Sequence, residues 1–376
     1  MHNRILSLLR QLVEINSVSP TLAKGPGEKQ LAEFVLQYLQ QLKLDAEIQF
    51  PAPDRANVVA GVAGTHRKRC LLLNGHLDTV GVEGMHDPFD LKVEGDRLYG
   101  RGAYDMKGSL AVMLMLAEYF TRHSPPIDIL FTFVADEEDK SVGMEHVIAQ
   151  WLPGIAAWPT GAVFLEPTEQ DIGVCHKGFA WYAIEIVGKA AHGSRPAEGV
   201  DAILPLRAAL HELSQIQSEL LNHAADPWLG HATLHGAIID GGTALSVIPA
   251  RAGLQWERRT LPGESRESLD GELRRVIRAV RRLPGAHGVS GHEIFMRPPY
   301  RVPADAHVLK TLQAASPESR LVGLPFWADS ALSGTAGIPS VLFGPAGHGA
   351  HGRDEWVSLK SLERVYEILR QVIMTF

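Results

Sequence analysis

The chain has 376 residues, of which 45% are hydrophobic, and its 43 acidic and 36 basic residues leave a formal net charge of −7. This length exceeds what one ordinary hydrophobic core organises, so we expect two domains. The net negative charge argues against nucleic acid or an anionic membrane surface as a partner. No apolar stretch approaches the roughly 18 residues of a membrane-spanning helix.

Strand-like and helical patterns alternate in the outer parts of the chain. The helical patterns occupy 1–19, 27–44, 106–120 and the region near 144–151. Apolar runs without strict alternation, typical of strands buried on both faces of a parallel sheet, occupy 57–62, 70–73, 127–135, 162–165 and 340–343. This alternation predicts an α/β domain in which helices flank a mostly parallel sheet.

The middle of the chain follows a different pattern. Strand-like segments at 181–187 and 254–257 accompany helical segments at 202–220 and 265–282. The order strand, helix, strand, strand, helix, strand over about 177–297 predicts a ferredoxin-like α+β sandwich. We therefore expect residues 1–176 and 298–376 to form one domain, with 177–297 inserted into it.

The N-terminus and the cysteines predict a cytoplasmic location. Charged residues such as Arg4, Arg10 and Glu14 interrupt the first helical pattern, which is not a signal peptide. Cys70 and Cys175 are too few for a disulfide framework in a chain of this length, which favours a reducing compartment.

Four predicted strands run directly into residue types that bind metals. In open α/β sheets, ligands bind at the carboxyl ends of the strands, so side chains far apart in sequence can converge there. The residues that follow these strands are His76 and Asp78, the acidic run 136–139, Glu166, and the histidines His348 and His351.

His76 and Asp78 form a short motif with two interpretations. Positions i and i+2 of an extended chain face the same way, so the Asp78 carboxylate could accept the second imidazole N–H and fix the metal-binding nitrogen of His76. A His–Asp pair that only ties down a loop is the alternative.

Each remaining acid also has an ordinary structural alternative. Asp105 follows a Gly-rich segment before an apolar helix, where it could bridge two metals or cap the helix. Glu137 and Glu138 are adjacent and should point in different directions, one as a metal ligand and one as a base, unless both lie in a solvated turn. Glu166 ends a buried strand, where an acid is costly unless it is paired or metal-bound.

Taken together, these residues predict a centre with two metal ions. The carboxylates of Asp105, Glu138 and Glu166 would repel one another, whereas two divalent cations would compensate their charge. His76 and His351 would be neutral ligands. Mixed histidine and carboxylate ligands suit zinc, with cobalt or manganese as substitutes.

These motifs resemble the M20 family of metallopeptidases, which includes acetylornithine deacetylases, succinyl-diaminopimelate desuccinylases and carboxypeptidases. The resemblance covers nearly the whole chain. It rests on GHLDTV (75–80), GRGAYDMKG (100–108), ADEE (135–138), EPT (166–168), GKAAHGSRP (188–196) and FGPAGHGAHGRDEWV (343–357).

The resemblance implies roles for the residues at the strand ends. Asp78 would orient His76, Glu137 would be the general base, and His351 is preferred over His348 because the family's ligand precedes a carboxylate, here Glu355, by four positions. The implied metal sites are His76, Asp105 and Glu166 for one ion, and Asp105, Glu138 and His351 for the other.

The resemblance also implies that 177–297 is a dimerisation lid. His192 matches a histidine that the family sends across the dimer interface into the partner's active site, so we expect a homodimer. Arg259 matches an arginine that meets the substrate carboxylate, although a structural role on a surface strand stays open. Ser246 stands where the family often has an asparagine that grips the substrate.

The expected activity is hydrolysis of the amide bond in a small N-acyl amino acid, as in acetylornithine deacetylases. A carboxypeptidase or dipeptidase acting on small peptides is the alternative within the family. An aminopeptidase with a similar two-metal core would need neither the lid nor His192. A binding protein that lost catalysis is disfavoured because base, ligands and oxyanion donor are all present.

Overall fold

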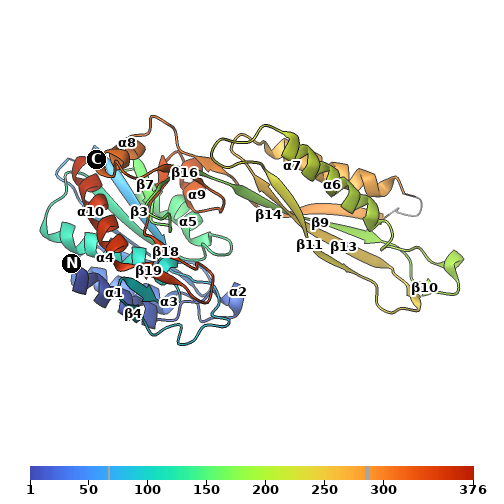
Figure 1. Cartoon of the computed structure of the whole chain (residues 1–376), viewed down its shortest axis with the longest axis horizontal. Coiled ribbons are helices and arrows are strands. Elements are labelled where there is room, and N and C mark those ends of the chain that lie inside the picture. Colours follow the sequence, from blue (N-terminus) through green and yellow to red (C-terminus); the bar gives the residue numbers. More distant parts are fainter. Residues whose placement is uncertain (67, 284–287) are drawn as a thin grey trace. The chain divides into compact units, whose positions relative to one another are not determined.

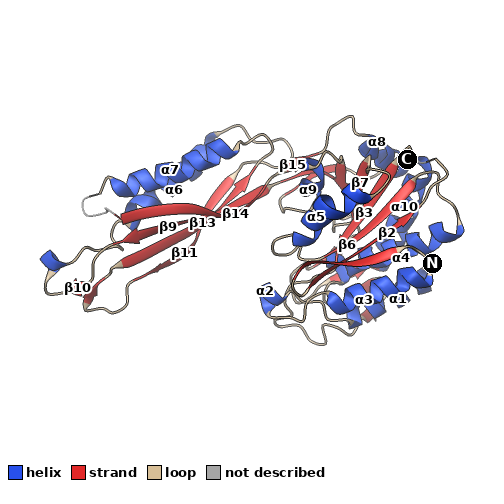
Figure 2. Cartoon of the chain, turned by 180° about the vertical axis from the view of Figure 1, so that it is seen from behind, coloured by secondary structure: helices blue, strands red, loops and turns tan. Residues whose placement is uncertain are grey.

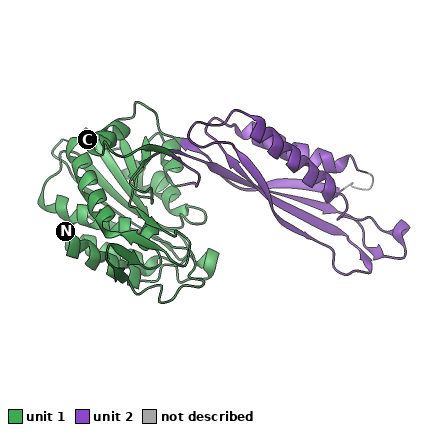
Figure 3. Ribbon diagram, in the orientation of Figure 1, with its two compact units in different colours: residues 1–174, 301–322, 328–376 green, residues 175–300, 323–327 purple. Residues whose placement is uncertain are grey.

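The computed structural model describes residues 1–66, 68–283 and 288–376, which form two compact units (Figures 1 and 3). Unit 1 comprises Met1–Val174, Arg301–Val322 and Ala328–Phe376, and unit 2 comprises Cys175–Tyr300 and Gly323–Trp327. No helix in the described part of the chain is both long enough and apolar enough to cross a membrane.

The segment 323–327 departs from the expected division, which assigned it to the larger domain. It packs with unit 2 because Gly323 lies against the backbone of Trp228, so closely that a Cβ there would lie 2.6 Å from the Trp228 carbonyl oxygen. The Trp327 indole N–H also donates to the Pro298 carbonyl at 3.0 Å. Such tertiary contacts leave no periodic signal in the sequence.

Unit 1 is organised by a 9-stranded sheet in the order β1-β2-β6-β3-β7-β17-β8-β15, with β16 also paired to β8 (Figure 2). These strands are β1 (Ala46–Ala52), β2 (Arg55–Val62), β3 (Cys70–His76), β6 (Asp128–Val134), β7 (Gly161–Phe164), β8 (Ile172–His176), β15 (Tyr300–Arg301), β16 (Leu321–Leu324) and β17 (Ser340–Leu342). The predicted α/β fold is confirmed. Strands β6, β3, β7 and β17 pair parallel, whereas the β1–β2, β2–β6 and β17–β8 pairs are antiparallel.

The helices of unit 1 surround α4, which packs on β2, β3 and β6 and is contacted in turn by α1, α3 and α10. Because α4 is enclosed, Gly108–Ala117 is buried on every side, which explains why its sequence is apolar without a polar face. The helical elements are α1 (His2–Glu14), α2 (Pro20–Ala23), α3 (Lys29–Gln41), η1 (Ala103–Lys107), α4 (Gly108–Arg122), α5 (Val142–His146), η2 (Val147–Trp151), η3 (Leu152–Gly154), α8 (His307–Ala315), α9 (Ser330–Thr335) and α10 (Leu359–Thr375).

Two predicted helices are shorter in the structure. The helix expected over 1–19 ends at Glu14, because Ser17 and Ser19 hydrogen-bond to the backbone of Thr79 just beyond β3. The helix expected over 27–44 spans Lys29–Gln41. In the first case a strand-like contact with a distant segment overrides the local helical pattern.

A small second sheet lies beside the carboxyl ends of the central strands. It has the order β18-β19-β5-β4 and joins residues near position 100 to residues near position 350. Its strands are β4 (Lys92–Glu94), β5 (Arg97–Tyr99), β18 (Gly347–His348) and β19 (Trp356–Ser358).

Unit 2 is a ferredoxin-like sandwich of one antiparallel sheet and two helices. The sheet order is β11-β13-β9-β14, which places the first and third strands in the middle. The elements are β9 (Gly178–Val187), β10 (Ala191–His192), η4 (Pro196–Glu198), α6 (Leu206–Asn222), β11 (Thr233–Gly241), β12 (Val247–Ile248), β13 (Arg251–Thr260), α7 (Arg266–Arg281) and β14 (Gly288–Arg297).

One face of this sheet is buried against α6 and α7. Alternate residues of β9, including Tyr182 and Ile184, form the core with Leu254 and Trp256 of β13. Tyr182 and Trp256 stack with ring centroids 5.5 Å apart. The period of two along these strands therefore sets which side chains remain on the opposite, open face.

The core of unit 2 contains a buried arginine. Arg258, with a side chain that is 0% exposed, lies 3.0 Å from Glu272 and also bonds to Glu264. Burial raises the pKa of Glu272 and the Arg258 guanidinium opposes this effect. The three charges therefore depend on one another in a site with little water.

We predict that Arg258→Ala lowers the free energy of unfolding by about 3–5 kcal/mol, because it leaves buried carboxylates without their counter-ion. Denaturant titration followed by circular dichroism measures this loss. Arg251→Ala on the same strand is the control; its side chain is 62% exposed, and we expect less than about 1 kcal/mol. Equal losses in the two variants would contradict the assigned role of the buried cluster.

Candidate metal centre

The structure brings the predicted ligands to one edge of the central sheet. His76 is the last residue of β3, Glu138 lies just after β6, and Glu166 lies just after β7. These three strands are adjacent and parallel, so their carboxyl ends meet. Asp105 comes from the turn η1 and His351 from the loop between β18 and β19.

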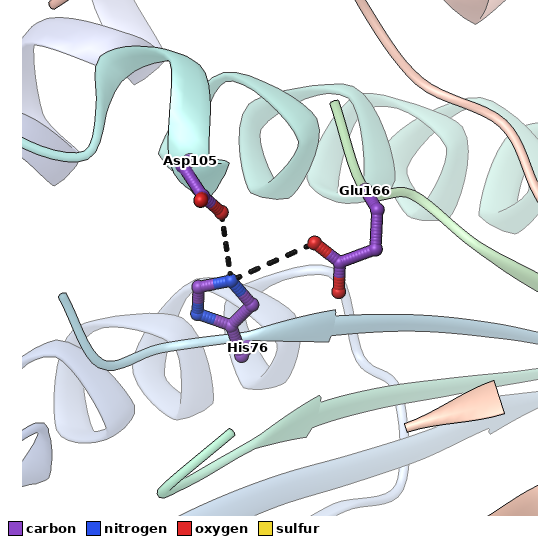
Figure 4. Close-up of side chains that lie close together, drawn as sticks. All are labelled: His76, Asp105 and Glu166. Atoms are coloured by element: carbon purple, nitrogen blue, oxygen red, sulfur yellow. Dashed lines mark hydrogen bonds and ion pairs between the residues drawn. The ribbon is translucent and has the colours of Figure 1, made fainter. Parts of the chain in front are cut away.

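Two groups of three residues form, and Asp105 belongs to both. In the first, His76 Nε2 lies 3.0 Å from Asp105 Oδ1 and 3.8 Å from Glu166 Oε2 (Figure 4). In the second, His351 Nε2 lies 3.3 Å from Asp105 Oδ2 and 3.1 Å from Glu138 Oε2. Each carboxylate oxygen of Asp105 thus faces a different histidine, the arrangement required of a carboxylate that bridges two ions.

The charges of the centre fit a pair of bound cations. Burial, opposed by the nearby His76 and reinforced by repulsion from Asp105 and Asp329, raises the pKa of Glu166 to about 8. Burial likewise raises the pKa of Glu138. Asp105 differs, because its interactions with the His351 and His76 imidazoles outweigh its burial and hold its pKa below the ordinary value. Nitrogen and carboxylate donors at these separations match the ligand preferences of zinc and similar divalent ions.

The structure corrects the expected role of Asp78. The backbone carbonyl of Asp78, and not its carboxylate, accepts the hydrogen bond from His76 Nδ1 at 3.0 Å; the nearest carboxylate oxygen is 3.7 Å away. This bond places the proton on Nδ1 and leaves Nε2 to face Asp105 and Glu166. The Asp78 carboxylate instead accepts the backbone N–H groups of Glu137 at 3.2 Å and Glu138 at 3.1 Å. Asp78 thus orients both His76 and the adjacent glutamates.

The acidic run after β6 separates into distinct environments. Asp136 pairs with the buried Arg55 at 2.5 Å and belongs to neither metal group. Glu138 meets His351, whereas Glu137 belongs to neither group of three. Burial raises the pKa of Glu137 well above its ordinary value, and repulsion from Glu166 adds to this. Glu137 is therefore a carboxylate beside the metal groups that is not needed as a ligand.

Glu355 is also a site residue, although in the sequence it served only to favour His351, which precedes it by four positions. Its buried carboxylate accepts backbone N–H groups from Gly102 at 2.9 Å, Tyr104 at 2.9 Å and Asp105 at 3.1 Å. It also pairs with Arg101 at 2.7 Å. Glu355 therefore fixes the loop that carries the shared Asp105. A lone acid before β19 gives no local sign of these partners.

The other predicted residues lie outside the two groups. His348 pairs with Trp356 between β18 and β19 and belongs to neither group. His192, Ser246 and Arg259 are in unit 2 (Figure 3). His192 is exposed on β10, and the Ser246 carbonyl accepts the Gly193 N–H at 2.7 Å. His192 and Ser246 thus lie close together at the two-stranded sheet of β10 and β12.

The comparisons with known proteins agree with this fold. Residues 72–375 match the model of peptidase family M20/M25/M40. Acetylornithine deacetylase from Proteus mirabilis (strain HI4320) is 32% identical, covering 99% of this chain and 96% of the relative. The enzyme of the same name from Buchnera aphidicola subsp. Schizaphis graminum (strain Sg) is 26% identical, covering 99% and 97%.

Solved structures share the fold at lower identity. A tripeptidase from Staphylococcus aureus superposes with a TM-score of 0.79 at 20% identity, over 100% of this chain and 98% of that chain. A dinuclear metal-binding peptidase from Bacillus subtilis gives 0.72 at 18% identity, over 100% and 98%.

The fold and the paired ligand groups define a metal-dependent hydrolase of amide bonds. The chain belongs to peptidase family M20/M25/M40, which confirms the resemblance found in its motifs.

We predict that Glu355→Gln weakens metal binding by about 10–100-fold. The backbone N–H groups of the loop donate to both carboxylate oxygens of Glu355, and the NH2 group of a glutamine cannot accept them. Titration of the metal-free protein with zinc, read by calorimetry, measures the change. Asp354→Asn, at the exposed neighbouring position, should bind zinc as the unmodified protein does. Unchanged affinity in Glu355→Gln would show that the Asp105 loop does not depend on this carboxylate.

Proposed function

We propose that the protein is a deacylase that hydrolyses the amide bond of N-acyl amino acids. The observation that carries the proposal is the shared carboxylate of Asp105 between two ligand groups, with the uncommitted Glu137 beside them. The full-length similarity to acetylornithine deacetylases supports deacylation. A carboxypeptidase or dipeptidase acting on small peptides is the second candidate, which the tripeptidase fold likeness favours.

The proposed metal sites follow the two groups. His76, Asp105 and Glu166 would hold one divalent ion, and Asp105, Glu138 and His351 the other, with zinc as our choice of metal. When bound, such a pair lowers the pKa of a shared water and polarises the substrate carbonyl. The hydrogen bond from His76 Nδ1 to the Asp78 carbonyl keeps the Nε2 lone pair directed at the first site.

Glu137 supplies the proton transfers in this mechanism. Its carboxylate accepts a proton from the attacking water and passes it to the leaving amine nitrogen as the amide C–N bond breaks. Asp78 holds the backbone N–H groups of Glu137 and Glu138, which keeps one side chain on the ligand His351 and leaves the other for the substrate.

Unit 2 would act as a lid and dimerisation domain in this proposal. His192 from a second copy of the chain would donate a hydrogen bond to the oxyanion of the tetrahedral intermediate. Strand β11 supports a homodimer because it is an edge strand that exposes Ile238 (53%) and Ile239 (57%), and such an edge is a ready surface for pairing with another chain. Ser246, beside His192, would contribute to substrate contact.

We further propose a cytoplasmic location. Cys70 and Cys175 are both free and buried. Burial and the nearby Asp128 raise the pKa of the Cys70 thiol to about 12, so it stays protonated and unreactive. Reduced cysteines of this kind suit a reducing compartment.

The central test separates the base from the ligand beside it. Glu137→Gln should lower kcat by about 10²–10⁴-fold with near-normal metal content, because it removes only the proton acceptor. Glu138→Gln should lose metal, because it removes a ligand. Steady-state kinetics and elemental analysis of both variants measure this.

Chelation provides the control for that test. Removal of metal should abolish activity of the unmodified protein, and added zinc or cobalt should restore it. A swapped phenotype, with metal lost from Glu137→Gln and retained in Glu138→Gln, would reverse the assignment. Full activity in a verified metal-free sample would refute the proposed function.

A subunit-mixing experiment tests the role of His192. Heterodimers of His192→Ala and Glu137→Gln chains should regain part of the activity, because one of their two sites has both groups intact. Homodimers of each variant should stay inactive. If heterodimers are demonstrated and activity does not return, His192 does not act across the dimer.

The substrate should carry a free α-carboxylate read by Arg259. A guanidinium pairs with a carboxylate through two parallel N–H bonds, whereas an ester or a primary amide cannot accept them in the same way. We expect the methyl ester of a good substrate to show a much lower kcat/KM. Arg259→Ala should remove most of this discrimination, and Arg259→Lys should restore only part. Equal turnover of ester and free acid would exclude a carboxylate anchor.

A further inference from the structure

His351 is the most exposed of the residues in the two ligand groups. It lies in the hairpin of β18 and β19, residues 347–358, which we call the His351 hairpin. Its side chain is 53% exposed, whereas those of the other ligands are between 1% and 14% exposed. Burial therefore does little to fix His351, and its position depends on the bonds that hold the two ends of the hairpin loop.

The β19 end of this loop is firmly attached. The Glu355 carboxylate accepts the backbone N–H groups of Tyr104 and Asp105. The following strand, β19, also pairs with β5 of the small sheet. The β18 end differs, because β18 is an edge strand of that sheet and is paired with β19 alone in the part of the chain that the structure describes.

Glu169 attaches the β18 end of the hairpin. One of its carboxylate oxygens, Oε1, accepts the backbone N–H of Gly347 at 3.1 Å. The same oxygen accepts the hydroxyl of Tyr104, the residue before Asp105. We call these two hydrogen bonds the Tyr104–Glu169 bridge. The bridge joins the start of the His351 hairpin to the loop that carries Asp105.

Close packing accompanies the bridge. Tyr104 is 7% exposed, and a Cβ added to Gly347 would lie 2.6 Å from Cδ2 of the Tyr104 ring. Glu169 is itself held beside the same segment, because its backbone N–H donates to the Pro345 carbonyl at 3.2 Å. The carboxylate and the ring thus meet Gly347 together.

The first ligand group depends less on these contacts. His76 ends β3 and Glu166 follows β7, and these two strands pair in parallel. The backbone N–H of Leu165, next to Glu166, donates to the Asn74 carbonyl at 3.0 Å. The sheet itself therefore holds two of the three ligands in the first group, whereas a loop carries His351 in the second.

We propose that Tyr104 and Glu169 are positioning residues for the second metal site, formed by Asp105, Glu138 and His351. The bridge holds the His351 hairpin against the Asp105 loop before an ion binds, so binding orders less of the chain and the ion is held more tightly. The inference rests on the metal sites of the proposed function. It goes beyond them because neither residue belongs to a ligand group.

Stepwise metal binding tests the bridge. Tyr104→Phe keeps the ring against Gly347 and removes the hydroxyl, so it should weaken binding of the second zinc ion by about tenfold and leave the first nearly unchanged. Glu169→Ala removes the oxygen that both donors share and should have at least as large an effect. Adding Tyr104→Phe to Glu169→Ala should cause little further loss, because both changes break one bridge. Calorimetric titration of the metal-free proteins with zinc measures these affinities.

Glu169→Gln separates hydrogen bonding from charge. A glutamine loses the negative charge and keeps an oxygen that can accept both hydrogen bonds. This variant should therefore retain most of the affinity for the second ion. A loss as large as that of Glu169→Ala would show that the charge of Glu169 attracts the ion, and it would overturn the positioning role.

A His351→Ala background identifies the ion that responds. This variant lacks a ligand of the second site, so it should bind one zinc ion at the first. Adding Glu169→Ala should then change the remaining affinity by less than about twofold, because the bridge acts through the missing ligand. A further tenfold loss would mean that the bridge supports the first site, and the proposal would be wrong.

Hydrogen exchange supplies a readout that requires neither metal nor turnover. In the metal-free protein, backbone amides of 346–352 should exchange faster in Tyr104→Phe and in Glu169→Ala, because the hairpin opens more readily. Tyr182→Phe is the matched control. The Tyr182 hydroxyl has no hydrogen-bond partner among the described residues, and its loss should change neither exchange in 346–352 nor zinc affinity.

The two readouts distinguish failure of the bridge from failure of the proposed function. Unchanged exchange and unchanged affinity for the second ion in both bridge variants would overturn the inference and leave the proposed function standing. If the unmodified protein did not bind two ions, the proposed metal sites would be refuted. Faster exchange in the bridge variants would then still show that Glu169 holds the hairpin. Circular dichroism of every variant excludes misfolding as the cause.

Discussion

The carboxylate of Asp105 faces a histidine on each side, with His76 Nε2 at 3.0 Å and His351 Nε2 at 3.3 Å. One ligand group comes from the central sheet and the other includes a loop of the small second sheet, so the two groups meet only through this residue. Its position depends on Glu355, whose carboxylate accepts hydrogen bonds from the backbone N–H groups of the loop around Asp105. A displaced Asp105 would separate both groups at once.

Several acidic residues lie close together near the carboxyl edge of the sheet, and they interact with different partners. Arg55 pairs with Asp136 at 2.5 Å and with Glu28 at 3.1 Å, and its charge opposes the rise in pKa that burial causes in both acids. Buried Lys107 donates to the Ile15 carbonyl at 2.7 Å and anchors the end of η1 to the segment after α1. Among the ligands, burial raises the pKa of Glu166, and the neighbouring His76 opposes this effect.

The sequence alone predicted the α/β fold and the residues that converge. Strands buried on both faces leave continuous apolar runs, and the residue after each run must lie at the carboxyl edge of the sheet. This rule located His76, Glu138 and Glu166 without any knowledge of distances. The ferredoxin-like order of unit 2 was also predictable, because strands with one buried face and amphipathic helices have different periods. The Gly-rich segment before an apolar helix made Asp105 a further candidate, and the family motifs favoured His351 over His348 and added the roles of the individual acids.

Only the tertiary structure decided which partner each polar group takes. Asp78 illustrates this. Its backbone carbonyl accepts the hydrogen bond from His76, and its carboxylate accepts the backbone N–H groups of Glu137 and Glu138. Spacing in the sequence cannot specify which oxygen of Asp78 takes which partner. The same holds for Glu355 and for the bond from Trp181 to Glu257. Periodicity records burial, which is a property of one segment, whereas a hydrogen bond depends on the distance and angle between two segments. The sequence therefore determined the elements and the candidate ligands, and the packing of distant segments determined the bonds that orient them.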